Sequence, residues 1–151
     1  MTCIAGISRN GKVTIGGDSA GVDSNYNLML RADPKVFRNS EFIIGYTTSF
    51  RMGQLLRFNF VPPKQKEQQD EFAYMCTDFV DAVRKCFADG GFKTVDKNVE
   101  SAGTFLIAYR NHLFKMESDF QISQSMKGID ACGCGESYAL GAMNVLVAQD
   151  I

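Results

Sequence analysis

Residues 2–21 read TCIAGISRNGKVTIGGDSAG, and this stretch predicts how the fold begins. Two short runs of apolar and small residues, 2–8 and 12–17, flank the pair Asn10-Gly11. An Asn-Gly pair favours the tight turn of a β-hairpin, because both residues tolerate positive φ. We therefore expect the chain to open with two paired strands, the second of which leads into Asp18.

The end of this hairpin also fits the pattern G-x-S-x-G, with Ser19 in the position of a serine nucleophile. Such a serine needs a helix directly after it and a histidine as its base. Residues 22–27, VDSNYN, are typical of a loop, and the single histidine, His112, falls at a second predicted turn. A solvated turn residue is the simpler interpretation of His112, so Ser19 is not expected to be a nucleophile.

Hydrophobic periodicity and turn residues predict the remaining elements. Further strands are expected at 26–31, 41–46, 103–109, 113–117 and 128–134, and helices at 49–58, 70–89 and 136–149. Strands and helices thus occur in blocks. This order favours an α+β layered fold over repeated βαβ units.

The composition indicates one globular domain over 151 residues. The net charge of -1 indicates no nucleic acid or anionic membrane as a partner, and no apolar run spans a bilayer. Five cysteines without a secretory signal indicate reduced thiols and a cytoplasmic protein. The motif Cys132-Gly133-Cys134 lacks a second ligand pair at zinc spacing, and Gly133-Cys134-Gly135 lacks the third glycine of a dinucleotide site. Neither a metal nor a cofactor is expected, and these small residues are interpreted as a strand-to-helix junction.

Thr2 is a candidate nucleophile of another kind. Removal of Met1, which a small second residue normally permits, would leave a threonine with both a hydroxyl and a free α-amine. An α-amine has a pKa of roughly 7.7–8.0, so it can act as a base near neutral pH. A threonine that uses its own amine needs no histidine, which suits this sequence.

Five segments, taken in order, resemble the proteasome β-subunit and HslV family of N-terminal nucleophile (Ntn) hydrolases. They are TCIAGISRNGKVTIGGDSAG, LRADPKVF, IIGYTTSFRMGQLL, GTFLIAYRNHLFKME and ACGCGESYALGAM. The resemblance covers nearly the whole chain and is strongest to the proteasome-like proteins of bacteria and their phages. It implies a four-layer αββα sandwich, with residues 1–151 as a single domain.

The same resemblance assigns three catalytic residues. Thr2 matches the family nucleophile, Asp18 the aspartate after the second strand, and Lys35, within Pro34-Lys35-Val36, the family lysine. A lysine cation beside Thr2 would lower the pKa of its amine and hydroxyl, and Asp18 would hold that cation in place. In this role, Lys35 is expected to be needed for turnover and to contribute little to folding. The alternative is an ordinary surface salt bridge between Asp18 and Lys35.

The sequence departs from the family pattern in three places. Thr48 stands where the family has a glycine whose backbone N–H faces the oxyanion; the N–H survives, but the side chain is expected to crowd the substrate path. Cys134 replaces a serine that supports the amine, and a thiol is a weaker hydrogen-bond donor. Family members also continue beyond the position of Ile151, so the chain is expected to lack the family's C-terminal elements.

Two functions follow from these residues. The first is a threonine amidohydrolase, a peptidase acting on a peptide or amide substrate, which the joint presence of Thr2, Asp18 and Lys35 favours. The second is a non-catalytic proteasome-like scaffold or assembly protein, which Cys134 and the shorter chain favour. The resemblance implies a homo-oligomeric ring, with Phe58 and Phe60 at or near the contact, unless both phenylalanines complete the core. An ATPase partner is compatible with the resemblance, but no residue points to one.

Overall fold

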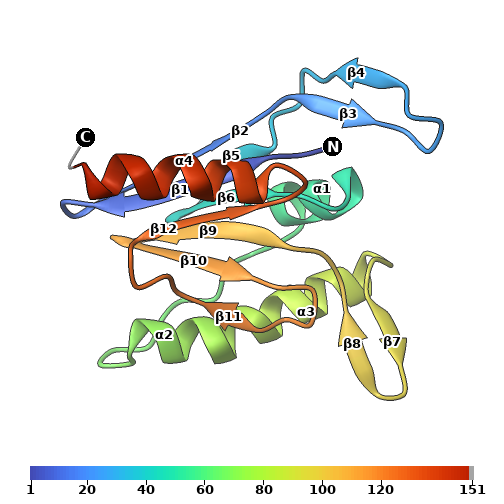
Figure 1. The fold of residues 1–151 in the computed structure, drawn as a ribbon. Coiled ribbons are helices and arrows are strands. Elements are labelled where there is room, and N and C mark those ends of the chain that lie inside the picture. The colour runs from blue at the N-terminus through green and yellow to red at the C-terminus, as the bar shows by residue number, and fades with distance from the viewer. Residues whose placement is uncertain (150–151) are drawn as a thin grey trace.

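The computed structural model describes residues 1–149, in which two antiparallel sheets lie face to face (Figure 1). The first sheet has the strand order β12-β1-β2 and the second the order β11-β10-β9-β6-β5. The strands of the first sheet are β1 (Ile4–Arg9), β2 (Lys12–Gly17) and β12 (Ile129–Cys132). Those of the second are β5 (Val36–Asn39), β6 (Phe42–Tyr46), β9 (Phe105–Tyr109), β10 (His112–Met116) and β11 (Ile122–Ser123).

Helices cover the outer face of each sheet and complete four layers, αββα, of an α+β fold (Figure 1). Helix α4 (Glu136–Ala148) lies on the first sheet, against β12 and β1. The second sheet is covered by α1 (Phe50–Phe58) and by a continuous helical segment made of α2 (Glu71–Tyr74), the π-helical turn η1 (Met75–Phe79) and α3 (Val80–Asp89). Two short hairpins, β3 (Ala20–Val22) with β4 (Leu28–Leu30) and β7 (Thr94–Asp96) with β8 (Val99–Ser101), project from this body (Figure 1).

The opening hairpin forms as its sequence predicts. Strands β1 and β2 pair from Ile4↔Gly17 to Arg9↔Lys12, and the turn between them uses φ values of 52° at Asn10 and 71° at Gly11. Ser49 caps α1 as expected, since its Oγ accepts hydrogen bonds from the N–H groups of Arg51 and Met52. The strands that the sequence did not indicate, β3, β5, β7, β8 and β11, have two to four residues each, too few to show an alternating pattern.

The main core fills the space between the second sheet and its helices and is rich in aromatic rings. The rings of Phe42 and Tyr109, for example, stack with centroids 4.4 Å apart. A smaller cluster between the two sheets includes Ile4, Leu106 and Leu113. Because Ile4 is fully buried there, the residues just before it are held at a fixed place on the first sheet.

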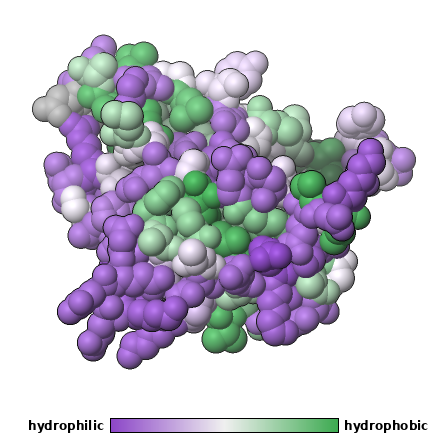
Figure 2. Space-filling model, turned by 90° about the horizontal axis from the view of Figure 1, so that it is seen from below, coloured by the Kyte–Doolittle hydropathy of each residue, from purple (hydrophilic) through white to green (hydrophobic). Residues whose placement is uncertain are grey.

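The two phenylalanines expected at an oligomer contact have different environments. Phe60 is 4% exposed and belongs to the main core, where its ring meets the edge of Phe79, so its predicted place at a contact is wrong. Phe58 is 72% exposed. Figure 2 shows the face below the view of Figure 1, where α2 and α3 lie. On this face, apolar residues form a patch surrounded by charged and polar ones. No helix within residues 1–149 is long and apolar enough to cross a membrane.

Candidate active site

The first strand pair brings Asp18 to the N-terminus of the chain. Thr2 and Cys3 directly precede β1, and Asp18 directly follows β2, whose last residue pairs with Ile4. The Asp18 N–H donates to the Cys3 carbonyl at 3.2 Å, and the Cys3 N–H donates to Asp18 Oδ2 at 2.5 Å. The register of the hairpin therefore fixes the aspartate beside Thr2.

Lys35 reaches this place from the second sheet. It lies just before β5 and is 3% exposed. Its Nζ is 2.9 Å from Thr2 Oγ1 and 2.9 Å from Asp18 Oδ1. The carbonyl oxygens of Ala20, at 2.5 Å, and Met1, at 3.1 Å, complete its surroundings. Of the three residues that the resemblance assigned to catalysis, Thr2 and Asp18 thus both lie within hydrogen-bonding distance of the third, the Lys35 ammonium.

The Asp18 carboxylate is held in its charged form. Partial burial alone would raise its pKa, but the hydrogen bond from Lys35 and the N–H groups of Cys3 and Ala20 hold that pKa below its usual value. The Ala20 N–H donates to Oδ1 at 2.7 Å. Because Lys35 is almost fully buried, the pair is not the exposed surface salt bridge considered as the alternative.

The turn between β12 and α4 closes over the main chain of Thr2. The Gly135 N–H donates to the Thr2 carbonyl at 3.2 Å. Gly133 has a φ of 96°, and a Cβ there would lie 2.3 Å from the Thr2 carbonyl oxygen. A Cβ on Gly135 would lie 2.6 Å from the Cβ of Cys3. Both glycines are therefore required by the close approach of the N-terminal segment.

Cys134 lies between these glycines and is exposed. Its side chain makes no hydrogen bond with any residue from 1 to 149, so none to Thr2. The interpretation of this segment as a strand-to-helix junction is confirmed, since β12 ends at Cys132 and Gly135 is the N-cap of α4. All five cysteines of the chain are free thiols.

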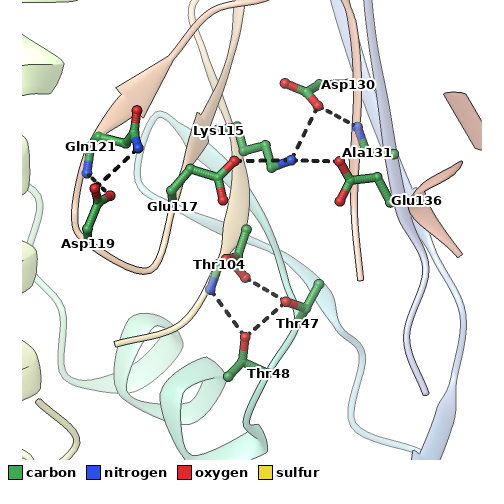
Figure 3. A network of polar contacts seen from close by, with 10 residues as sticks. All are labelled: Thr47, Thr48, Thr104, Lys115, Glu117, Asp119, Gln121, Asp130, Ala131 and Glu136. Carbon is green, nitrogen blue, oxygen red and sulfur yellow. Dashed lines mark hydrogen bonds and ion pairs between the residues drawn. The ribbon is translucent and has the colours of Figure 1, made fainter. Parts of the chain in front are cut away.

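Thr47 and Thr48 lie between β6 and α1, where they contact Thr104 (Figure 3). Thr48 has a φ of 67°, and the Thr104 N–H donates to its Oγ1 at 3.2 Å. The Thr48 side chain also lies against Gly103, where a Cβ would be 2.8 Å from it. Its hydroxyl is therefore held by Thr104, the residue just before β9.

A cavity of about 310 Å³ lies next to Phe50, the first residue of α1. It is lined by the β3–β4 hairpin, by Arg31 and by Phe50. The Arg31 guanidinium lies 3.7 Å from the centre of the Phe50 ring and is paired with Asp33, and Lys35 Nζ lies 5.6 Å from the same ring. The cavity is thus adjacent to the buried cation.

A second polar cluster joins the two sheets behind the β12–α4 turn (Figure 3). Lys115 of β10 is 7% exposed, and its Nζ lies 3.2 Å from Glu117, 3.8 Å from Asp130 and 3.0 Å from Glu136. Burial raises the pKa of the Asp130 carboxyl. Since Glu136 is the first residue of α4, this cluster anchors the helix that follows the turn over Thr2.

Two residues considered in the serine hypothesis take no part in this geometry. Ser19 lies in the turn between β2 and β3, and its carbonyl accepts a hydrogen bond from the Arg31 N–H at 2.9 Å. His112 pairs with Glu71 at the start of α2, at the far end of the molecule from the N-terminus (Figure 1). No group of three or more His, Cys, Asp or Glu side chains within residues 1–149 could hold a metal ion.

Comparison with known proteins identifies the fold. No protein-family model and no curated protein sequence matches the chain. Several solved structures do match. BPH from Thiobacillus denitrificans, in complex with epoxomicin, is 19% identical with a TM-score of 0.75 over 95% of this chain and 78% of its own. HslV from Trypanosoma brucei is 14% identical with a TM-score of 0.61 over 96% of this chain and 79% of its own.

Anbu from Yersinia bercovieri is 12% identical, with a TM-score of 0.55 over 89% of this chain and 61% of its own. These likenesses define the class: the chain has the proteasome-like Ntn-hydrolase fold. Within that class it is similar to BPH, HslV and Anbu, and the predicted αββα sandwich is confirmed.

Proposed function

We propose that this chain is an N-terminal threonine amidohydrolase that cleaves peptide bonds, with Thr2 as its nucleophile after removal of Met1. The observation that carries the proposal is the contact between the buried Lys35 ammonium and the Thr2 hydroxyl, at 2.9 Å. A fixed cation at this distance stabilises negative charge on Oγ1 and so favours loss of its proton. Asp18 keeps the cation oriented.

The proposed reaction uses only groups of the chain and water. Thr2 Oγ1 attacks the peptide carbonyl carbon, and its proton passes to the neutral α-amine of Thr2. The amine then donates this proton to the leaving nitrogen, the C–N bond breaks, and an ester with Thr2 remains. Water hydrolyses the ester, which restores the hydroxyl and releases a carboxylic acid. The N–H of Thr48 is the proposed donor to the carbonyl oxygen as it becomes negative.

The surroundings of Lys35 support the removal of Met1. An ammonium has three protons to donate, whereas four acceptors lie within 3.1 Å of this Nζ. Loss of Met1 removes one of these acceptors, its carbonyl oxygen, and leaves Thr2, Asp18 and Ala20 for the three protons. The same cleavage converts the Thr2 nitrogen from an amide into the amine that the reaction needs.

A non-catalytic scaffold is the second candidate, and Cys134 in place of the family serine favours it. A chain that keeps Met1 has the Met1 carbonyl on Lys35 and no free amine at Thr2. In either case we propose a cytoplasmic homo-oligomer, because the chain has exposed apolar residues and free thiols.

Intact mass and covalent labelling distinguish the two candidates. The enzyme should have lost one methionine and should gain the mass of one epoxomicin, the compound bound by BPH from Thiobacillus denitrificans. Peptide mapping should then place the added mass on Thr2. The variant Thr2→Ala should gain no mass, and Ser19→Ala should react as the parent protein does. Retention of Met1, or labelling that survives in Thr2→Ala, would contradict the proposed enzyme.

A further inference from the structure

Thr48 has a backbone conformation that its residue type avoids. Its φ is 67°, in the left-handed region. A β-branched side chain is a genuine outlier there, because its Cβ substituents crowd the neighbouring backbone. Such strain persists only where the surroundings hold the residue, and it is concentrated at functional sites.

Hydrogen bonds among three threonines hold residue 48 in this conformation (Figure 3). The Thr47 hydroxyl and the Thr47 N–H both donate to the Thr104 carbonyl, at 2.9 Å and 3.1 Å. The Thr104 N–H donates back to Thr48 Oγ1 at 3.2 Å, and the hydroxyls of Thr47 and Thr48 lie 3.1 Å apart. We call Thr47, Thr48 and Thr104 the threonine clamp. It ties the end of β6 to the start of β9 across the residue with positive φ.

The clamp borders the main chain of Thr2. A Cβ on Gly133 would lie 3.2 Å from the Thr47 methyl group and 2.3 Å from the Thr2 carbonyl oxygen. Thr48 itself is exposed, and its N–H donates no hydrogen bond to any group within residues 1–149. The direction of this N–H is therefore set by the backbone conformation of Thr48 and, through it, by the clamp.

We propose that the Thr48 hydroxyl is a positioning group. By accepting the Thr104 N–H it holds residue 48 at positive φ, and it thereby aims the Thr48 N–H that the proposed function uses as the oxyanion donor. The inference rests on that function. A glycine reaches the same φ without any clamp, so a threonine at this position needs the hydroxyl, whereas glycine does not.

A series of substitutions at Thr48 tests this role through the rate of epoxomicin labelling of Thr2. Thr48→Ser keeps the hydroxyl, while Thr48→Val keeps the shape and removes it. We expect Thr48→Val to react at least about tenfold more slowly than Thr48→Ser, since one misplaced oxyanion donor costs roughly 10²–10³ in rate. Thr94→Val, the same change at an exposed threonine of β7, should react at the parental rate.

A second pair of variants covers the case in which Thr48→Val does not fold. Thr48→Ala has a Cβ but no hydroxyl, and Thr48→Gly has neither, so glycine should react faster than alanine. Equal rates within both pairs would overturn the inference while leaving the proposed function intact. Hydrogen exchange of the Thr104 amide gives a readout independent of chemistry, and it should be at least about tenfold faster in Thr48→Val than in Thr48→Ser. If the parent protein loses Met1 and still takes up no label, the proposed function fails, and the catalytic role of the clamp fails with it.

Discussion

At the scale of single residues, Lys35 organises the N-terminal site. It is the one cation within residues 1–149 that meets the Thr2 hydroxyl, and it is almost fully buried. A buried ammonium is stable only when acceptors surround it, and here a carboxylate, a hydroxyl and two carbonyl groups do so. Its removal must therefore affect both the chemistry and the folding of the chain.

The substitution Lys35→Met should abolish epoxomicin labelling of Thr2 and also destabilise the fold. The expectation from sequence that Lys35 contributes little to folding does not fit its burial. Breaking a fully buried ion pair costs about 3–5 kcal/mol, and we expect about 2–3 kcal/mol here because the Asp18 side chain is one-third exposed. Urea unfolding measures this loss, with Lys12→Met on exposed β2 as the control. Labelling at the parental rate would refute the role of Lys35.

Asp18 should make the free energy of unfolding decrease as the pH falls through the acidic range. Its pKa in the folded chain lies below the ordinary value of 3.8, so its contribution is fully present above about pH 5. This contribution is lost below about pH 4, as the pH falls through the lowered pKa and the Asp18 carboxylate of the folded chain becomes protonated. The difference in unfolding free energy between the parent and Asp18→Asn should be constant from pH 7 to 5 and shrink toward pH 3. A difference that grows on acidification would contradict this assignment.

At the scale of elements, the turn from β12 to α4 is as important to the site as any side chain. Its backbone holds the Thr2 carbonyl through the Gly135 N–H, and Lys115 fixes the start of the helix through Glu136. The turn has no room for side chains at Gly133 or Gly135. Changes to this junction should therefore be transmitted directly to Thr2.

The substitution Gly133→Ala should displace Thr2 and destabilise the chain. The new Cβ would meet the Thr2 carbonyl oxygen at 2.3 Å, and the φ of 96° is unfavourable for alanine. We expect an unfolding free energy lower by about 1–3 kcal/mol, which is typical of strain at special backbone angles. Gly141→Ala is the matched control, because nothing lies within 4 Å of its new Cβ inside α4. That variant should be more stable by about 0.5–1 kcal/mol. Equal effects at both glycines would refute the close packing.

The sequence predicted the elements that have strong local signals. The Asn10-Gly11 turn, the Ser49 cap and the periodic helix after Asp70 all appear where expected. The sequence did not predict β3, whose Ala20 carbonyl contacts Lys35, or β5, which follows Lys35. Strands of three or four residues carry too little pattern.

The candidate site was predictable only in part, for a similar reason. Resemblance to a family supplied Thr2, Asp18 and Lys35. The groups that surround them include the Ala20 carbonyl, the Cys3 N–H and the Gly135 N–H, and backbone groups leave no mark on residue identity. Thr48 was identified, but its left-handed conformation and its bond to Thr104 depend on contacts between β6 and β9 that local sequence does not encode.

At the scale of the whole molecule, apolar residues remain exposed in several regions, which include the β3–β4 hairpin and the end of α1. Leu28, Met29 and Leu30 of the β3–β4 hairpin are each more than 60% exposed, and Phe58 at the end of α1 is 72% exposed. Strand β4 is thus open to solvent on both faces beside the candidate site (Figure 1). Exposed apolar groups of this kind mark surfaces that contact another protein.

We expect the chain to form a homo-oligomer, with Phe58 near the contact. Light scattering at micromolar concentration should give a multiple of the chain mass. Phe58→Ser should lower that mass, whereas Phe72→Ser, at the 43% exposed position in α2, should not. Circular dichroism should show that both variants keep their helices. A monomeric parent protein would exclude the oligomer.

The hydrogen bond between the Thr2 carbonyl and the Gly135 N–H also has a consequence for the timing of synthesis. The β1–β2 hairpin leaves the ribosome early, together with Asp18 and soon afterwards Lys35. Strand β12, the turn after it and α4 emerge last among the described elements, and β1 gains its second neighbour, β12, only then. A nascent chain therefore carries a threonine whose main chain is still unanchored, so its N-terminal site is incomplete until the fold is closed.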